Sequence, residues 1–371
     1  MPEYDESGRV IRKAYSATTL GALFQYLNED LKDSSLSLKM CIFLAEKNIS
    51  ELLSTNEIKR VKEKVTVLDT NQEILKYDFT LYGNLGDTQE GSGIYFKHPS
   101  FDDVYIYVSF DPMFIFKRVL SNYFNKFYPK ISQIFLTSNQ IKTIIAETST
   151  KLNTSALISR FVVKRPYPNA EVDIKYQHEK IDFKKAFLSA EVDNYDVNSL
   201  NVFVRDMDFN VSREGYFVLN SGNFTQFDAL VFAKTFEFVK NKKQVYSNRE
   251  RREENKYEAS PLLIKFNHDL FNSVDDMKNL VKRVFDNIER SFYSVSHLNP
   301  YLQMSFTGFE DGSSFEIWVL NKNQLFIVPQ FRATFPSVTK VINAIFRDFS
   351  EGEVIDVKTN NSVELNGRAI N

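Results

Sequence analysis

The sequence predicts an α+β fold in which antiparallel sheets are backed by amphipathic helices, divided between two subdomains. Three observations lead to this prediction. The chain of 371 residues is at or beyond the size at which a single hydrophobic core stops growing. Apolar residues recur at helical spacing in some segments and form short runs bounded by turns in others. Elements of these two kinds bury their apolar sides most readily against each other.

The aromatic content is high for a globular chain. Hydrophobic residues make up 43% and charged residues 25%, which is ordinary for a folded protein. The chain contains 34 Phe and 18 Tyr but only one Trp and 12 Gly. Aromatic side chains fill cores and the faces of sheets. A core built on phenylalanine is therefore the main interpretation, and a Tyr/Phe recognition surface is the alternative.

Local patterns place the first elements. Apolar residues between 20 and 31 form one stripe at helical spacing, which predicts a helix. A continuous apolar run predicts a buried strand over 36–45, and the charged segment 49–64 predicts a more exposed helix. Segment 83–93 holds four of the twelve glycines and is expected to be a loop.

A strand followed by a helix recurs three times, at intervals of roughly one hundred residues. Strands are predicted at 104–110 and 216–219, and a meander at 304–328, each before an amphipathic helix. The copies share negligible sequence, and repeat families usually have periods of about 20 to 50 residues. A common hairpin-and-helix pattern is therefore the simpler interpretation. The residues of the last helix that are expected to face the sheet are Val341, Ile342 and Ile345.

Two features indicate how the chain divides. The connector 164–170 contains two prolines, which favour an extended backbone, and a boundary is predicted there. We predict an α+β domain over 1–165, a second over 166–350 and a polar tail over 351–371. Within the second domain, segment 241–259 buries too little to offset an ordering cost of about 1 to 2 kcal/mol per residue, which predicts a mobile loop.

Charge, cysteine content and hydropathy restrict the environment. The net charge is −2, so binding to nucleic acid or to a membrane would need a local basic patch. The single cysteine, Cys41, lies in an apolar run and cannot close an intramolecular disulfide, which fits a reducing compartment. The N-terminus lacks a signal-peptide pattern, and no apolar stretch approaches the roughly 18 to 20 residues that span a bilayer. We therefore expect a cytoplasmic protein without membrane contact.

The sequence carries no motif for a metal, phosphate or nucleophile site. The four histidines are far apart, and Gly91-Ser92-Gly93 is too common a pattern to indicate a phosphate loop. A nucleophile elbow is absent, and Cys41 in its apolar run is a poor candidate for a thiolate. The sequence therefore predicts no metal and no cofactor.

The enzymatic alternative is a divalent-metal nuclease. Asp173-Ile174-Lys175 has the D-x-K pattern of such sites, in which carboxylates and a lysine surround the cation. The nearest acids that could complete the site are Glu171 and Asp111, and neither lies on an obvious preceding strand. Charged residues also occur on the exposed face of a strand, which explains Asp173 and Lys175 equally well. A second acidic group fits a hairpin turn: Glu310, Asp311 and Glu316.

A basic segment is the candidate for nucleic-acid binding. Between 240 and 252, six Lys or Arg residues stand against one Glu, enough to neutralise several phosphates. Tyr246 could stack on a base. The alternative is a solvated loop whose charge is offset by nearby glutamates. The predicted contacts are Lys240, Lys242, Lys243, Tyr246, Arg249, Arg251 and Arg252, and a smaller basic group is Arg160, Lys164 and Arg165.

The absence of convergent catalytic residues in so long a chain predicts a non-enzymatic adaptor or binding subunit. A partner protein is expected, and nucleic acid is a further candidate through the basic segment. The Phe, Asn and Lys usage suggests an AT-rich genome, so an intracellular bacterial or phage complex of the antiviral-defence type is the expected setting. The divalent-metal nuclease is the alternative, and the sequence indicates no oligomeric state.

Overall fold

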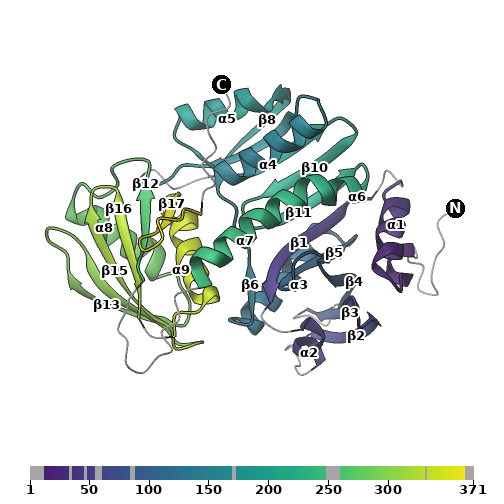
Figure 1. The fold of residues 1–371 in the computed structure, drawn as a ribbon, viewed down its shortest axis with the longest axis horizontal. Coiled ribbons are helices and arrows are strands. Elements are labelled where there is room, and N and C mark those ends of the chain that lie inside the picture. The colour runs from purple at the N-terminus through teal and green to yellow at the C-terminus, as the bar shows by residue number, and fades with distance from the viewer. Residues whose placement is uncertain are drawn as a thin grey trace.

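The computed structural model describes residues 12–32, 36–45, 48–54, 61–83, 88–168, 173–247, 260–330 and 332–363. The strands form two antiparallel sheets, one of eleven strands and one of six, and helices pack against both (Figure 1). The predicted α+β class is confirmed. Within the described ranges, every helix is too short or too polar to cross a membrane.

The larger sheet is organised around strand β1 (Leu38–Ala45), whose eight residues are all buried. The strands lie in the order β2 (Val61–Asp69), β3 (Ile74–Tyr82), β4 (Thr88–Lys97), β5 (Val104–Ser109), β1, β11 (Tyr216–Ser221), β10 (Met207–Ser212), β9 (Asp196–Val204), β7 (Leu157–Lys164) and β8 (Asp173–Asp182), with β6 (Ile131–Gln133) also beside β1. One edge of β1 pairs with β5. The other edge pairs with β11 over residues 38–41 and with β6 over residues 43–45.

Helices pack on both faces of the larger sheet, and more of them pack on one face than on the other. Those of the first 247 residues are η1 (Lys13–Ser16), α1 (Leu20–Asp30), α2 (Ile49–Ser54), α3 (Met113–Phe127), α4 (Ser138–Lys151), α5 (Phe183–Val192), α6 (Phe224–Phe227), η2 (Asp228–Phe232) and α7 (Ala233–Ser247). Side chains of α1, α4, α5, α6, η2 and α7 pack on one face (Figure 1). On the opposite face, α2 and α3 pack beside β1 to β5. No described helix covers that face of β7, β9 and β10.

The smaller sheet is also antiparallel and also packs against helices. Its strands lie in the order β13 (Ser291–His297), β14 (Gln303–Gly308), β15 (Ser314–Asn321), β16 (Gln324–Pro329), β12 (Leu262–Phe266) and β17 (Gly352–Asp356). Its core also contains side chains of α8 (Val274–Leu280), η3 (Val281–Phe285) and α9 (Phe335–Asp348). The predicted meander and final helix are confirmed, and the three predicted core residues of α9 are each at most 1% exposed: Val341, Ile342 and Ile345.

The two sheets contain the same topological unit. A first strand (β1 or β12) is followed by a helix, a four-stranded meander, a second helix and a last strand. The final meander strand (β5 or β16) pairs with one edge of the first strand, and the last strand (β6 or β17) pairs with its other edge. Helices α3, α6 and α9 begin at Met113, Phe224 and Phe335, at equal intervals of 111 residues. The recurrence in the sequence thus includes a repeat of topology, although the copies differ in sequence.

Two predicted elements differ from the structure. The helix expected over 49–64 ends at Ser54, and β2 begins at Val61. The loop expected over 83–93 includes the start of β4. Glycine is needed within this strand because a Cβ on Gly93 would lie 2.2 Å from a ring atom of Tyr107. Glycine here marks the close approach of a side chain to the backbone.

One helix in the C-terminal half also differs from its prediction. The spacing of Ser273 and Asp276 predicts a capping box that begins a helix reaching Phe292. The capping box is present, but the helix ends at Phe285. Phe292, predicted on that helix, lies instead in β13.

The boundary predicted between residues 165 and 166 falls between β7 and β8, which pair with each other in the larger sheet. The two sheets divide between β11 and β12.

Candidate functional site

The basic segment predicted to be a mobile loop begins as a helix. Residues 241–247 of the predicted loop belong to α7, so the loop prediction is wrong for them. Tyr246 is 1% exposed and lies beside Phe335, with ring centroids 6.0 Å apart, so it cannot stack on a base. Lys242 is also buried, and its Nζ donates to the carbonyl oxygen of Phe135. The helix continues because its apolar side chains pack into the core of the smaller sheet.

The remaining predicted contacts of this segment fall into two groups. Lys240 and Lys243 are exposed on α7, and Lys243 forms an ion pair with Asp103. Three others lie outside the described residues: Arg249, Arg251 and Arg252. The described part of the segment thus offers two exposed lysines, fewer than the six cations expected to act together.

The residues of the nuclease alternative lie at a sheet edge. Asp173 and Lys175 belong to β8, the last strand of the larger sheet. Of the two acids considered with them, Glu171 is outside the described residues. Asp111 accepts a hydrogen bond from the backbone nitrogen of Ser92 at 2.9 Å. In the part of the chain that the structure describes, no three His, Cys, Asp or Glu side chains gather closely enough to hold a metal ion.

The acidic group 310–316 belongs to the hairpin between β14 and β15. Asp311 Oδ1 accepts a hydrogen bond from the backbone of the turn at 2.9 Å. Glu310 Oε2 lies 2.9 Å from Nζ of Lys340, and Glu316 is on β15 itself. Asp311 thus stabilises the turn, and Glu310 binds a lysine of the neighbouring helix α9. These roles agree with the hairpin turn that the sequence indicates.

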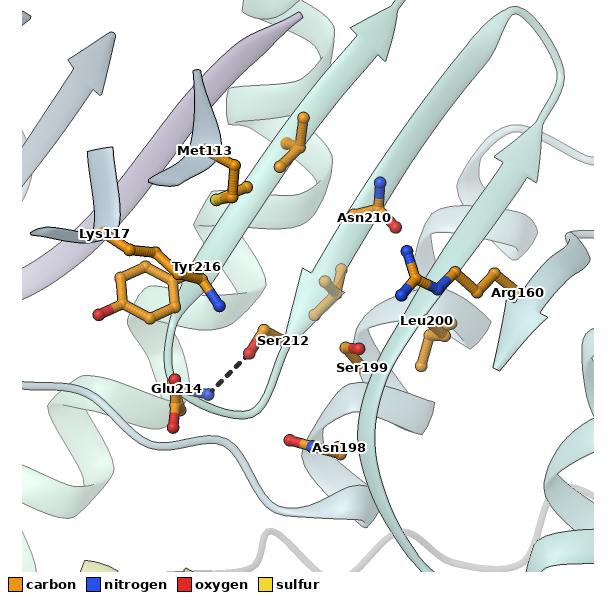
Figure 2. A pocket seen from close by; sticks show the side chains of 12 residues that line it. Met113, Lys117, Arg160, Asn198, Ser199, Leu200, Asn210, Ser212, Glu214 and Tyr216 are labelled. Atoms are coloured by element: carbon orange, nitrogen blue, oxygen red, sulfur yellow. Dashed lines mark hydrogen bonds between the residues drawn. The ribbon is translucent and has the colours of Figure 1, made fainter. Parts of the chain in front are cut away.

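A groove lies on the open face of the larger sheet. It exists because α3 packs on this face beside β1 but does not extend over β7, β9 and β10, so that Met113 and Lys117 of α3 line one side of it (Figure 2). The groove encloses about 420 Å³. Its lining comes from α3 (Met113, Lys117), β7 (Arg160), β9 (Asn198, Ser199, Leu200), β10 (Asn210, Val211, Ser212), and β11 with the turn before it (Glu214, Tyr216, Val218).

Strand register brings the polar side chains of the groove together. Along β10, side chains alternate between buried and half-buried positions. Those on the open face are Asp208, Asn210 and Ser212. Asn210 stands opposite Asn201 on β9, which stands opposite Arg160 on β7. A single row across three strands thus carries a guanidinium group and two amides.

The charges of the groove come from different walls. Lys117 and Arg160 are both exposed and approach from opposite sides, whereas Glu214 lies at one end (Figure 2). Nζ of Lys117 is 5.3 Å from the ring centroid of Tyr216, a cation–π contact. Burial raises the pKa of the Tyr216 hydroxyl above its usual value, so this side chain remains neutral. The groove therefore offers two cations together with amides and hydroxyls, which suits a polar, anionic ligand.

Of the residues that line the groove, the sequence indicates only Arg160 as a binding candidate, and it does so as part of a different basic group. Arg160 was expected beside Lys164 and Arg165, but these three side chains have different surroundings. Nζ of Lys164 donates to the carbonyl oxygen of Arg347 at 2.8 Å, and Nη2 of Arg165 donates to the hydroxyl of Tyr195 at 3.0 Å. The missed signal is the strict alternation of β10, Met-Asp-Phe-Asn-Val-Ser, which indicates one polar face.

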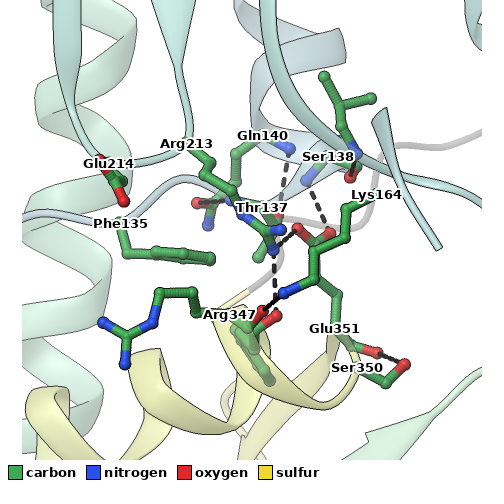
Figure 3. Close-up of polar contacts among 12 residues, drawn as sticks. Phe135, Thr137, Ser138, Gln140, Lys164, Arg213, Glu214, Arg347, Ser350 and Glu351 are labelled. Carbon is green, nitrogen blue, oxygen red and sulfur yellow. Dashed lines mark hydrogen bonds and ion pairs between the residues drawn. The ribbon is translucent and has the colours of Figure 1, made fainter. Parts of the chain in front are cut away.

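A buried polar cluster joins the two sheets. Arg213, between β10 and β11, is 2% exposed, and its Nη2 lies 2.6 Å from Oε1 of Glu351 (Figure 3). The same nitrogen donates to the carbonyl oxygen of Phe346 on α9 at 3.1 Å. Oε2 of Glu351 accepts a hydrogen bond from the backbone nitrogen of Ser138 at 2.8 Å. We call Ser138, Asp196, Arg213 and Glu351 the inter-sheet cluster.

Asp196, at the start of β9, adds a second carboxyl group to this cluster. Burial, reinforced by the negative charge of Glu351, raises the pKa of Asp196 to about 8. The positive charge of Arg213 and a hydrogen bond from the backbone of Glu351 oppose this rise only in part. The folded protein therefore holds a proton in the inter-sheet cluster at neutral pH.

We expect Asp196 to make the free energy of unfolding fall as the pH rises from about 4 to about 8. Its carboxyl group keeps a proton in the folded state up to pH about 8, whereas in the unfolded chain it loses that proton near pH 4. The stabilising contribution is complete below the unfolded pKa and is lost as the pH approaches the folded pKa. Asp196→Asn should flatten this profile, measured by urea unfolding at several pH values.

The control is Asp206→Asn in the exposed turn between β9 and β10. Other groups titrate in the same range, so the informative quantity is the difference between each variant and the native chain. This difference should change with pH for Asp196→Asn and stay constant for Asp206→Asn. A constant difference for both variants would contradict the proton assigned to Asp196.

Comparisons with known proteins identify no family for this chain. No protein-family model matches the sequence, and no curated protein matches it either. Among solved structures, the chain is similar to DNA polymerase III subunit beta from Borrelia burgdorferi in complex with a natural product. The identity is 8%, the match covers 90% of each chain, and the TM-score is 0.13. A likeness of this size carries no argument about function.

Proposed function

We propose that this chain is a non-enzymatic binding subunit whose ligand is a single strand of nucleic acid, held in the groove on the open face of the larger sheet. The observation that supports this proposal is that the register of β7, β9 and β10 brings Arg160 and Asn210 together in the groove, with Lys117 on the facing wall. Open sheet faces with polar side chains are a common platform for unpaired nucleotides, whose base edges are accessible.

Each part of the groove has a matching chemical role. The guanidinium of Arg160 presents a planar fork of donors that fits a phosphate, and Lys117 supplies a second positive charge on the opposite side. The amides of Asn198 and Asn210 can donate to and accept from base edges. Glu214 at one end repels phosphate, so we expect the backbone of the strand to pass between Lys117 and Arg160 and away from Glu214.

The experiment measures binding of a fluorescently labelled strand of about 20 nucleotides by anisotropy at several salt concentrations. Lys117→Ala combined with Arg160→Ala should weaken binding by about tenfold or more, because two phosphate contacts are lost. The slope of log affinity against log salt should become shallower by about 1.4, or about 0.7 per contact on a single strand. Lys184→Ala, an exposed lysine on α5, is the matched control and should leave both quantities unchanged.

Three outcomes would overturn this proposal. Unchanged binding in the double variant, together with weaker binding in Lys240→Ala, would move the site to α7 and the basic segment. Cleavage of the labelled strand in Mg²⁺ or Mn²⁺, abolished by Asp173→Ala, would establish the alternative of a metal-dependent nuclease. Absence of binding at any salt concentration would refute the nucleic-acid ligand itself.

A further inference from the structure

The edges of the two sheets differ in their protection against pairing with other strands. Charged side chains occur along both edge strands of the larger sheet: Lys62, Glu63, Lys64 and Asp69 on β2, and Asp173, Lys175, Glu179, Lys180 and Asp182 on β8. Charges of this kind discourage edge-to-edge association. In the smaller sheet, the edge strand β17 is covered by the returning chain, because the backbone nitrogen of Val363 donates to the carbonyl oxygen of Val354 at 2.9 Å.

Strand β13, the other edge of the smaller sheet, carries no charged side chain of this kind, and no segment among the described residues covers it. Its sequence, Ser-Phe-Tyr-Ser-Val-Ser-His, contains no Lys, Arg, Asp, Glu or Pro. Among the described strands it pairs only with β14. Five of its seven residues are exposed, including Phe292 at 60% and Val295 at 37%. A bulge interrupts the register of β13 with β14 between Val295 and His297. The rest of this uncharged and exposed edge is a template for another strand.

A second exposed phenylalanine lies near this edge. Phe292 stands opposite Thr307 on β14, and Phe309, two residues past Thr307, is 66% exposed. The backbone nitrogen of Phe309 donates to the carbonyl oxygen of Arg290 at 2.8 Å, which holds it next to the start of β13. Two large aromatic side chains are therefore exposed at the same end of an unprotected strand.

We infer that β13 pairs with β13 of a second copy of this chain, antiparallel and about a twofold axis at Ser294. In an isologous pair of this kind, β13 of one copy lies against β13 of the other. The uncharged sequence of β13 allows this because no like charges meet. In this register Tyr293 faces Val295 of the second copy, an aromatic and β-branched pair of the type that stabilises sheets. The two six-stranded sheets would then form one continuous antiparallel sheet.

The size of this contact sets the expected affinity. One shared strand edge, with Phe292 and Phe309 at its ends, is at the small end of specific interfaces, well below the roughly 1,600 Å² of a standard one. We therefore expect a dimer with a Kd in the micromolar range, about 1 to 100 µM. This inference is independent of the groove, because β13 and the groove lie on different sheets.

The test uses the full chain and exploits the position of Ser294 on the axis. Ser294→Lys puts a lysine directly against the lysine of the second copy, and Ser294→Glu does the same with glutamates. Each variant alone should show a Kd at least about tenfold higher in sedimentation velocity, because like charges directly opposite each other destabilise a strand pair. An equimolar mixture of the two variants should restore the dimer, since opposite charges then meet at the axis.

The control is Ser305→Lys, which stands opposite Ser294 on the neighbouring strand β14 and is also exposed. It adds the same charge to the same face, one strand inside the edge, and should leave the Kd unchanged within about twofold. A native chain that stays monomeric up to about 200 µM would overturn the inference. So would a dimer that survives in both Ser294 variants but is lost in Val67→Lys, which would place the contact on the edge strand β2 instead.

Discussion

Replacing Arg213 by Met is expected to lower the free energy of unfolding by about 3 to 5 kcal/mol. The guanidinium is 2% exposed and bonds both Glu351, at 2.6 Å, and the carbonyl oxygen of Phe346. Methionine fills a similar volume but leaves the carboxylate of Glu351, whose side chain is only 11% exposed, without its cation. The loss therefore comes mainly from an uncompensated buried charge.

The measurement is urea unfolding followed by two signals. Far-ultraviolet circular dichroism reports on the whole chain, whereas tryptophan fluorescence reports on the smaller sheet, because the single tryptophan, Trp318, lies in β15. Since Arg213 joins the two sheets, we expect Arg213→Met to separate the midpoints of these signals. Adding Glu351→Gln should recover part of the loss in the free energy of unfolding, because it removes the unpaired negative charge of Glu351.

Arg205→Met, in the exposed turn between β9 and β10, is the matched control and should change the free energy of unfolding by less than about 0.5 kcal/mol. Both substitutions remove an arginine from a turn next to β10, so they differ mainly in burial. A loss of less than about 1 kcal/mol for Arg213→Met would show that the ion pair contributes little to the junction of the sheets.

Ile345→Ala is expected to lower the free energy of unfolding by about 2 to 5 kcal/mol. Ile345 is fully buried on α9, within the hydrophobic core of the smaller sheet. Its truncation removes apolar contacts and leaves a cavity that the surrounding strands fill only in part. Because the cavity lies in the smaller sheet, the fluorescence of Trp318 should show the loss directly.

Asn343→Ala on the same helix provides the comparison, since Asn343 is partly exposed and alanine favours helices. It should change the free energy of unfolding by less than about 0.5 kcal/mol. If Ile345→Ala had an effect of this small size, the apolar face of α9 would not be packed on the sheet as described.

Elements with a strong local pattern could be predicted from the sequence. Strand β1, helix α1, the meander of β14 to β16 and the apolar face of α9 each follow from periodicity within about 20 residues. The end of α7 could not, because a run of charges conceals two buried side chains, Lys242 and Tyr246. The stem of a lysine packs well against apolar surface, so charge alone does not exclude a helix there.

The candidate site could not be predicted because it depends on distant pairings. The groove needs the register of β7, β9 and β10, and it needs α3 to lie on the opposite face from α7. The inter-sheet cluster combines residues that are far apart in the sequence: Ser138, Asp196, Arg213 and Glu351. None of these side chains has a local partner, so no spacing in the sequence indicates that they meet.

The central position of β1 has a consequence for synthesis on the ribosome. Strand β5 and the short β6 can reach β1 early, but residues 38–41 pair on their other side only with β11, which begins at residue 216. At about 5 to 20 residues per second, this partner emerges roughly 9 to 36 s after β1. During that interval the nascent chain exposes an apolar strand edge whose only charge is Lys39. We expect this edge to be the segment of the nascent chain with the greatest need of a chaperone.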